Sequence, residues 1–393
     1  MIDFQTVAAI TFIALLSILL YIKRKNLDTK FLIPYVLYFS MYKTTLGIKL
    51  MDLWAKKYRR FVVFLGYFGI FVGFVGMILI SYSLVSNLYH LFTKPEAAPG
   101  VGLVLPFKAK GVFFVPFFYW IISIFVIAVV HEFLHGLIAR AHNLKVKSSG
   151  FAFLGLIIPV IPAAFVEPDE KELKKRPHKE QLSVFAAGPF ANIAAAFLFL
   201  ALASFVIAPI VNASIEVNGV KITDYVKDKF PAETAGMEIG EIIQEVDGQK
   251  ITYVDNLSAI LKSKKPGDII NVETDKASYT IKLAKNPENE SLAYIGAYLE
   301  QNTKVKDNIK AKFGEFLPKA ITWVYGLMII LVILNLGIGL FNLVPIGPLD
   351  GGRMMQLVMH KFFDKEKGDR IWTYIGVFFL LMILVNLFFG FVR

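Results

Sequence analysis

His131, Glu132 and His135 form the pattern H-E-F-L-H inside a long apolar run, Phe113–Ala141. Two histidines four positions apart on an α-helix are rotated by about 40° from each other, so their imidazoles share one face. Such a pair can chelate a divalent ion, and the glutamate beside it can act as a base toward water bound there. The alternative is a chance match in which both histidines are hydrogen-bonded core residues, expected in roughly one such sequence in a few hundred. Because charged and polar groups are costly at membrane depth, we favour a functional site.

Two further motifs carry polar residues next to apolar runs. Asp350 is the only acidic residue of Asn342–Gly352, where two prolines and three glycines end an apolar segment. Asn192 follows Gly188 and Pro189 in A-A-G-P-F-A-N, near the start of another apolar segment. Glycine and proline permit close approach and a bend. A helix-packing role and a catalytic role fit this second motif equally well.

The composition indicates the elements that must position these residues. The chain has 393 residues, of which 56% are hydrophobic, and a mean hydropathy of +0.57. Several apolar runs are long enough to span about 30 Å of hydrocarbon. The six predicted spans are Thr6–Ile22, Phe61–Leu84, Phe113–Ala141, Leu182–Val211, Ala320–Leu343 and Trp372–Val392. The fold class is therefore a multi-pass α-helical membrane protein.

Charge and cysteine content narrow the function. The net charge is +11, but the lysines and arginines flank the apolar runs, a pattern of membrane orientation rather than of nucleic-acid binding. The chain has no cysteine, so any metal must be held by histidine, aspartate or glutamate. No cleavable signal peptide is expected, because the first apolar run ends in Lys23-Arg24-Lys25 rather than at a small-residue cleavage site.

The basic residues also predict an orientation. The stretch 23–60 is the strongest positive cluster and is expected in the cytoplasm. Six spans then place both termini outside the cell membrane. In this arrangement His131, Asn192 and Asp350 lie at similar depth, near the cytoplasmic ends of three spans. Two histidines and one carboxylate make a catalytic zinc set that leaves one position for water.

Residues 212–305 break the membrane pattern with short alternating apolar segments. Asp247-Gly248 between two such segments is a hairpin signal. A helix and two strands are expected at Asn256–Lys264, Ile269–Glu273 and Tyr279–Leu283. This insert resembles a PDZ domain of the protease-associated type found in bacteria and archaea, a small α+β fold. The resemblance implies that it takes a peptide strand at a sheet edge; the alternative is a structural spacer with an unused groove.

Three segments stay ambiguous. Gly150–Val166 is too short and too rich in proline to span the membrane, and we favour a re-entrant hairpin that lines a cavity over a surface loop. Phe31–Met41 lies in the membrane interface or forms a packed loop. Four glycines of the second span serve close helix packing or simply face lipid; they are Gly66, Gly69, Gly73 and Gly76.

From Phe113 to the C-terminus, the chain resembles the site-2 protease family of intramembrane zinc metalloproteases. The features that carry this resemblance are H-E-F-L-H, A-A-G-P-F-A-N, the PDZ-like insert and N-L-V-P-I-G-P-L-D-G-G. The resemblance implies that Zn²⁺ is the cofactor, with Glu132 catalytic. The implied ligands are His131, His135 and Asp350, and the implied neighbours of the active site are Asn192 and Asn342, with Gly188 and Pro189 in the same motif. It also implies single-span membrane-protein substrates, cut in the lipid bilayer within or near their helix. The PDZ-like groove then docks or filters a peptide or an ectodomain.

The expected organisation has four parts. Residues 1–112 hold two transmembrane helices and a basic cytoplasmic loop; 113–211 and 306–393 form the protease core; 212–305 is the extracytoplasmic PDZ-like domain. A transporter would predict an internal repeat, and the sequence has none. A scaffold acting only through its PDZ-like groove would predict that the histidines and Glu132 are dispensable. Zinc is the expected metal, with cobalt or iron able to replace it in vitro.

Overall fold

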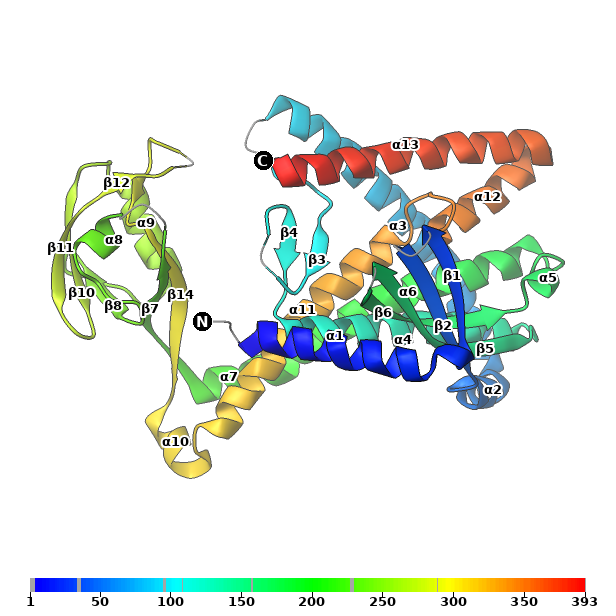
Figure 1. The fold of residues 1–393 in the computed structure, drawn as a ribbon, viewed down its shortest axis with the longest axis horizontal. Coiled ribbons are helices and arrows are strands. Elements are labelled where there is room, and N and C mark those ends of the chain that lie inside the picture. Colours follow the sequence, from blue (N-terminus) through cyan, green and yellow to red (C-terminus); the bar gives the residue numbers. More distant parts are fainter. Residues whose placement is uncertain are drawn as a thin grey trace. The chain divides into compact units, whose positions relative to one another are not determined.

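The chain folds into two compact units (Figure 1). Unit one comprises Met1–Ala203 and Gly326–Arg393, and unit two comprises Ser204–Tyr325. The structure is a computed structural model, which describes residues 4–33, 37–94, 97–107, 109–156, 158–226, 230–287 and 289–392.

Six helices among the described residues are long and apolar enough to cross a membrane. They are α1 (Phe4–Ile22), α3 (Arg59–Thr93), α4 (Phe117–Ala141), α6 (His178–Leu202, continued to Ser214 through a π-turn and α7, Ala208–Ser214), α11 (Phe316–Phe341) and α13 (Lys365–Val392). The predicted multi-pass helical fold is confirmed. Most helices extend beyond the predicted apolar runs, because hydropathy marks only the part of a helix that is free of polar residues.

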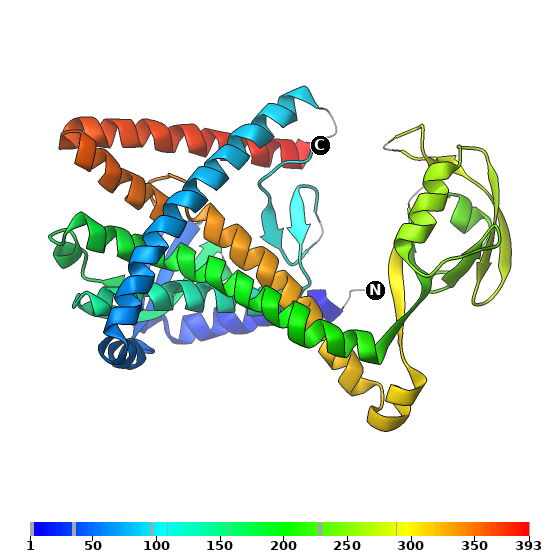
Figure 2. The same ribbon diagram turned by 180° about the vertical axis from the view of Figure 1, so that it is seen from behind.

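Helix α3 packs against the rest of unit one through its glycines. Figure 2 shows α3 crossing the other helices of the unit. Gly66, Gly69, Gly73 and Gly76 are all buried on one side of the helix. A Cβ atom at Gly76 would lie 2.5 Å from the Cδ1 atom of Leu343. The glycines therefore serve close packing, the first of the two interpretations that the sequence left open.

A four-stranded antiparallel sheet completes unit one, in the order β1-β2-β5-β6. Its strands are β1 (Leu27–Ile33), β2 (Leu37–Thr44), β5 (Val146–Leu156) and β6 (Ile158–Pro168). Strands β5 and β6 are the hairpin expected around Gly150–Val166. Segment Phe31–Met41 contributes to a strand pair instead of a loop, because β2 completes the backbone hydrogen bonds of β5 from Leu37 to Thr44. Pro34 lies outside the described residues.

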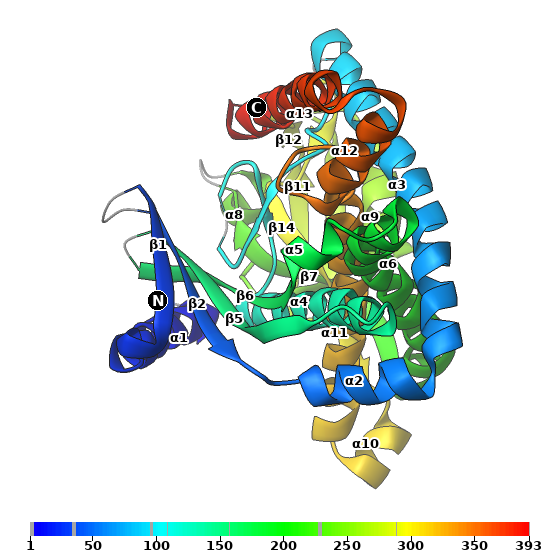
Figure 3. The same cartoon turned by 90° about the vertical axis from the view of Figure 1, so that its right-hand side faces the viewer.

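Strand β6 is the edge of this sheet and lies beside α4 (Figure 3). Short elements connect the larger ones: α2 (Ile48–Lys57), β3 (Leu103–Leu105) paired with β4 (Val112–Phe114), and α5 (Glu170–Leu173). The loop after α11 leads into α12 (Asp350–Phe362), a helix that the sequence analysis did not predict. Asp350 is therefore the first residue of a helix, with Leu349 as its N-cap, rather than part of a loop.

Unit two is a small α+β domain with the sheet order β11-β10-β8-β7-β14, and β9 paired to β8. Its main elements are β7 (Ile215–Tyr225), α8 (Pro231–Thr234), β8 (Ile242–Val246), β9 (Gln249–Lys250), α9 (Val254–Ser263), β10 (Ile269–Thr274), β11 (Ser278–Lys282), β12 (Ala284–Lys285), β13 (Ala293–Tyr294), β14 (Ala297–Val305) and α10 (Asp307–Phe313). At the β8–β9 hairpin, Asp247 and Gly248 have φ values of 51° and 78°. Positive φ at both positions is what a type I′ turn requires, so the predicted hairpin is confirmed.

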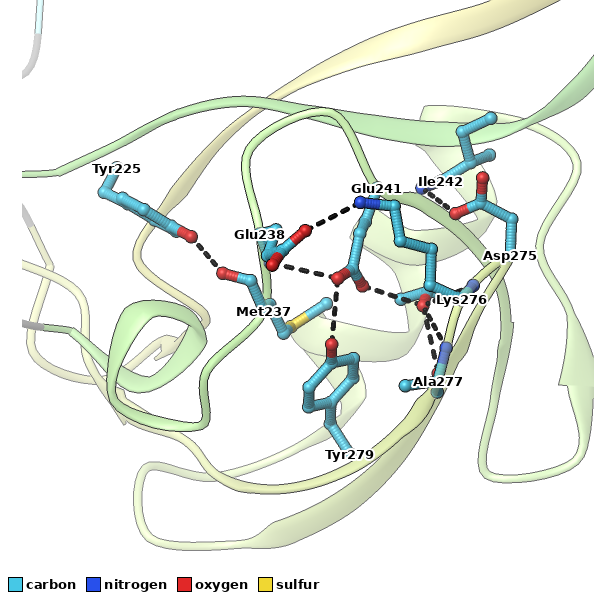
Figure 4. A network of polar contacts seen from close by, with 10 residues as sticks. Tyr225, Met237, Glu238, Glu241, Ile242, Asp275, Lys276, Ala277 and Tyr279 are labelled. Carbon is cyan, nitrogen blue, oxygen red and sulfur yellow. Dashed lines mark hydrogen bonds and ion pairs between the residues drawn. The ribbon is translucent and has the colours of Figure 1, made fainter.

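A buried carboxylate holds one loop of unit two in place (Figure 4). Glu241 is only 1% exposed. Its carboxylate accepts hydrogen bonds from the N–H of Glu238 at 3.2 Å, the hydroxyl of Thr274 at 2.8 Å and the hydroxyl of Tyr279 at 2.9 Å. Burial of a charge is tolerated where hydrogen bonds replace its hydration. The three bonds fix the loop before β8 to strands β10 and β11.

Candidate metal centre

The two histidines of the H-E-F-L-H motif turn the same ring nitrogen toward one point. His131 and His135 lie one turn apart on α4, and their Nε2 atoms are 3.1 Å apart. The Oδ2 atom of Asp350, at the start of α12, lies 3.2 Å from the first and 3.3 Å from the second. The fold thus brings together three residues that are up to 219 positions apart.

The spacing of these three donor atoms fits a zinc ion. Tetrahedral coordination with bonds of about 2.0–2.1 Å keeps neighbouring donor atoms about 3.3 Å apart. The histidine side chains are 12% exposed and that of Asp350 17%, so the site is shielded but not closed. The donor set of two imidazoles and one carboxylate leaves a fourth position open, as catalytic zinc sites do.

Electrostatics favour the ligating form of the aspartate. Burial by itself raises the pKa of the Asp350 carboxyl, but in the metal-free protein the protonated imidazoles of His135 and His131, whose protons a metal would replace, outweigh that effect and hold the pKa below its ordinary value. The carboxyl group is therefore ionised at neutral pH. An ionised carboxylate is the form that binds a metal.

Each imidazole is oriented through its other nitrogen. The Nδ1–H of His135 donates to the carbonyl oxygen of Val184 at 2.7 Å, which leaves Nε2 free for a metal. The amide of Asn192 lies 3.1 Å from Nδ1 of His131, and its buried Oδ1 atom has no partner among the described residues. Turning the amide by 180° places Oδ1 against the ring N–H of His131. We assign this orientation, because it satisfies the oxygen and leaves Nε2 of His131 free.

Glu132 is held by the edge strand of the sheet. Its Oε2 atom accepts a hydrogen bond from the backbone N–H of Val166 on β6, at 2.8 Å. Glu132 lines a cavity of about 580 Å³ together with the three candidate ligands. Asn342 and Arg353 also line this cavity, as does the end of β6. The carboxylate is thus positioned beside the candidate metal centre and next to a strand edge.

Gly188 is required by the close approach of α6 to the histidines. A Cβ atom at this position would lie 2.5 Å from Cε1 of His131 and closer still to Nε2 of both imidazoles. Pro189 is buried within α6, and its carbonyl faces Gly339 of α11. Within the G-P-F-A-N motif, Gly188 and Asn192 therefore contact the site, whereas Pro189 contributes to helix packing.

Sequence reasoning missed the groups that orient the predicted residues. The carbonyl of Val184 and the N–H of Val166 are backbone atoms, so residue type gives no signal for them. The position of Arg353 near the site could have been predicted, because this residue directly follows the L-D-G-G motif. Its guanidinium lies 3.6 Å from the carboxylate of Glu170, at the side of the same cavity.

Comparison with known proteins identifies the family of this chain. Residues 119–383, about two thirds of the chain, match the family model described as peptidase family M50. The chain belongs to peptidase family M50. The predicted relation to site-2 proteases is therefore confirmed, and the matched region contains H-E-F-L-H, G-P-F-A-N and L-D-G-G.

Several known proteins are similar to this chain in sequence. An uncharacterized protein of Methanocaldococcus jannaschii is 28% identical over 272 residues, which cover 67% of this chain and 62% of that protein. Zinc metalloprotease RasP of Shouchella clausii is 23% identical, covering 57% and 62%. Regulator of sigma-W protease RasP of Bacillus subtilis is 22% identical, covering 56% and 60%. The chain thus spans about three fifths of the length of these relatives.

A solved structure is similar to part of the chain. The PDZ domain of the SdrC-like protein from Listeria monocytogenes is 26% identical and covers 21% of this chain and 87% of that one, with a TM-score of 0.19.

Proposed function

We propose that this M50 family member is an intramembrane zinc metalloprotease that hydrolyses peptide bonds within or near the transmembrane segment of membrane proteins, as in regulated intramembrane proteolysis. The observation that carries the proposal is the triangle of donor atoms from His131, His135 and Asp350, with the carboxylate of Glu132 in the same cavity. A transporter needs no such triangle, and a scaffold needs neither the triangle nor the base.

The proposed roles follow from the contacts of each side chain. His131, His135 and Asp350 would hold a zinc ion, which would supply Lewis-acid chemistry toward water and the peptide carbonyl. Glu132 accepts the proton of the attacking water on its carboxylate and passes it to the leaving amine. The amide of Asn192 and the carbonyl of Val184 keep the two imidazoles oriented.

The edge of β6 offers a place for an extended substrate. The N–H of Val166 points away from β5 toward Glu132, so Ala164, two residues earlier, also directs its N–H and C=O away from β5. Pro162 and Pro168, farther along the same edge, have no N–H. A substrate strand pairing with this edge therefore receives its hydrogen bond from Ala164, two residues before the N–H that Glu132 accepts. Such pairing would expose the backbone carbonyls that a helix hides.

Ala164→Pro tests this pairing. The substitution removes the outward N–H without removing a hydrogen bond to β5. We expect kcat/KM to fall roughly fivefold to tenfold, the effect of losing one hydrogen bond, while bound zinc stays unchanged. Ala164→Ser keeps the N–H and serves as the control. Unchanged cleavage by the proline variant, measured on a single-span substrate, would show that β6 does not pair with the substrate.

The orientation in the membrane belongs to the same proposal. The basic stretch 23–60 supports a cytoplasmic location for that segment, with both termini and the PDZ-like domain outside and the metal centre toward the cytoplasm. The PDZ-like domain then docks or filters substrate ectodomains or peptides, and the substrates are single-span membrane proteins.

Metal removal tests the proposed function. The protein is reconstituted in liposomes with a single-span substrate, stripped with a zinc chelator, and then supplied again with zinc. Cleavage should disappear with the metal and return with it, with about one zinc per chain measured by elemental analysis. Cleavage by the metal-free protein would contradict the proposal. A protein that binds no zinc and cleaves no substrate in a panel would favour the scaffold.

A further inference from the structure

A second cavity, of about 880 Å³, lies between α2, α3 and α4. None of the described residues that line it is charged. Its walls include Leu50 and Trp54 of α2, Phe61 and Leu65 of α3, and Val130 and Phe133 of α4. Trp54 packs edge-on against Phe133, with ring centroids 5.6 Å apart. This groove is apolar enough to hold a hydrocarbon chain.

The groove is separate from the metal centre. It shares no lining residue with the 580 Å³ cavity. Val129, Val130, Phe133 and Leu137 lie about 100–160° around α4 from His131, at 100° per residue, and Leu134 lies about 60° from it, on the side away from His135. A polypeptide in the groove would therefore face the back of α4 and could not present a peptide bond to the candidate ligands. The occupant is not the segment that is cut.

The rim of the groove carries a cation, Lys57, whose Nζ atom lies 5.2 Å from the ring centroid of Tyr58, a residue that lines the groove. The same stretch, residues 49–60, holds four more cations, Lys49, Lys56, Arg59 and Arg60, of which Lys56 and Arg59 line a separate cavity. The only acidic residue of this stretch, Asp52, forms an ion pair with Arg140. Trp54 and Tyr58 are 42% and 48% exposed beside these cations. Amphipathic aromatic side chains next to lysine and arginine are typical of the level of lipid headgroups.

We propose that this groove binds an anionic glycerophospholipid, with an acyl chain between α2, α3 and α4 and the phosphate at Lys57 and Arg60. The apolar walls match the acyl chain, and Lys57 at the rim, with Arg60 three positions later in the sequence, matches the negative headgroup. Arg59 is less free to turn to a headgroup, because its Nε–H already donates to the carbonyl of Ala141 at 3.0 Å. The site also explains why the basic stretch before α3 lies on an amphipathic helix. It does not depend on the proposed function.

Quenching of Trp54 fluorescence tests the site in the full chain. The protein is reconstituted in phosphatidylcholine bilayers that contain the same fraction of either brominated phosphatidylglycerol or brominated phosphatidylcholine. The signal of Trp54 is the difference between wild type and Trp54→Phe. We expect the anionic lipid to be preferred roughly tenfold or more, from two cations near the headgroup.

Matched variants locate the preference. The double variant Lys57→Gln, Arg60→Gln should bring the ratio of the two lipid affinities close to one. The control double variant Lys361→Gln, Lys367→Gln, which removes two cations of α12 and α13, should leave that ratio unchanged. Val129→Phe, which narrows the groove, should reduce quenching by both lipids. A preference that survives the Lys57 and Arg60 substitutions would overturn the proposal. The absence of Trp54 quenching by either lipid would also overturn it, and would favour a protein occupant such as a second copy of the chain.

Discussion

Glu132→Gln is expected to lower kcat for substrate cleavage by about 10²–10⁴-fold, the usual effect of losing a general base, while zinc stays at about one per chain. Glutamine keeps a carbonyl oxygen that can accept the N–H of Val166, so the side chain can stay where the carboxylate lies. What it loses is the ability to accept and return a proton at neutral pH. Elemental analysis and cleavage of a single-span substrate in liposomes measure the two quantities separately.

Two further variants sharpen this experiment. Glu167→Gln changes another carboxylate of the same cavity, one that accepts a hydrogen bond from Ser148 at 2.6 Å, and should have little effect on kcat. Glu132→Ala removes both the base and the contact with β6, so a KM that differs from that of Glu132→Gln would show that this contact affects substrate binding at the strand edge. Activity retained by Glu132→Gln would show that this residue is not the base, and would call for a search for a contaminating protease.

The chemistry of the site was largely predictable because it rests on side chains with rigid spacing. A separation of four residues on a helix fixes the relative orientation of the His131 and His135 side chains, wherever the helix lies. Hydropathy and loop charge predicted that Asp350 lies at a depth similar to that of the histidines, whereas its assignment as the third ligand came from the resemblance to site-2 proteases. Residue type also indicated Asn192 and Gly188, although the sequence could not decide between packing and catalysis for their motif.

The sheet was predictable only in part, since strand pairing depends on partners that are distant in the chain. Residues 150–166 are apolar almost throughout, so they lack the alternation that reveals a strand with one exposed face. Strand β2 pairs with β5 across more than 100 residues, from Leu37 opposite Leu156 to Thr44 opposite Ser149. No local pattern records that register. The position of Val166 against Glu132 depends on the pairing of β6 with β5 and on the packing of β6 beside α4, and it was equally hidden.

The candidate site depends on how closely α6 approaches α4, and Gly188→Ala tests that contact. We expect bound zinc to fall well below one per chain and cleavage to fall by at least about 100-fold, the upper range for residues that orient metal ligands. The added methyl group would overlap Nε2 of both imidazoles. The rings cannot move away without giving up their contacts with Asn192 and Val184.

A matched glycine separates this effect from a general cost to the helix. Among the described residues, nothing beyond the neighbouring backbone of its own helix lies within 4 Å of the expected Cβ position of Gly337 on α11, so Gly337→Ala should bind zinc and cleave substrate like wild type. Alanine is the better helix former, so helix propensity alone would favour both variants. Position 188 also precedes Pro189, where a Cβ adds backbone strain; the thermal unfolding midpoint registers that cost, whereas zinc stoichiometry reports on the imidazoles. Normal zinc content in Gly188→Ala would mean that α6 lies farther from the ligands than the structure places it.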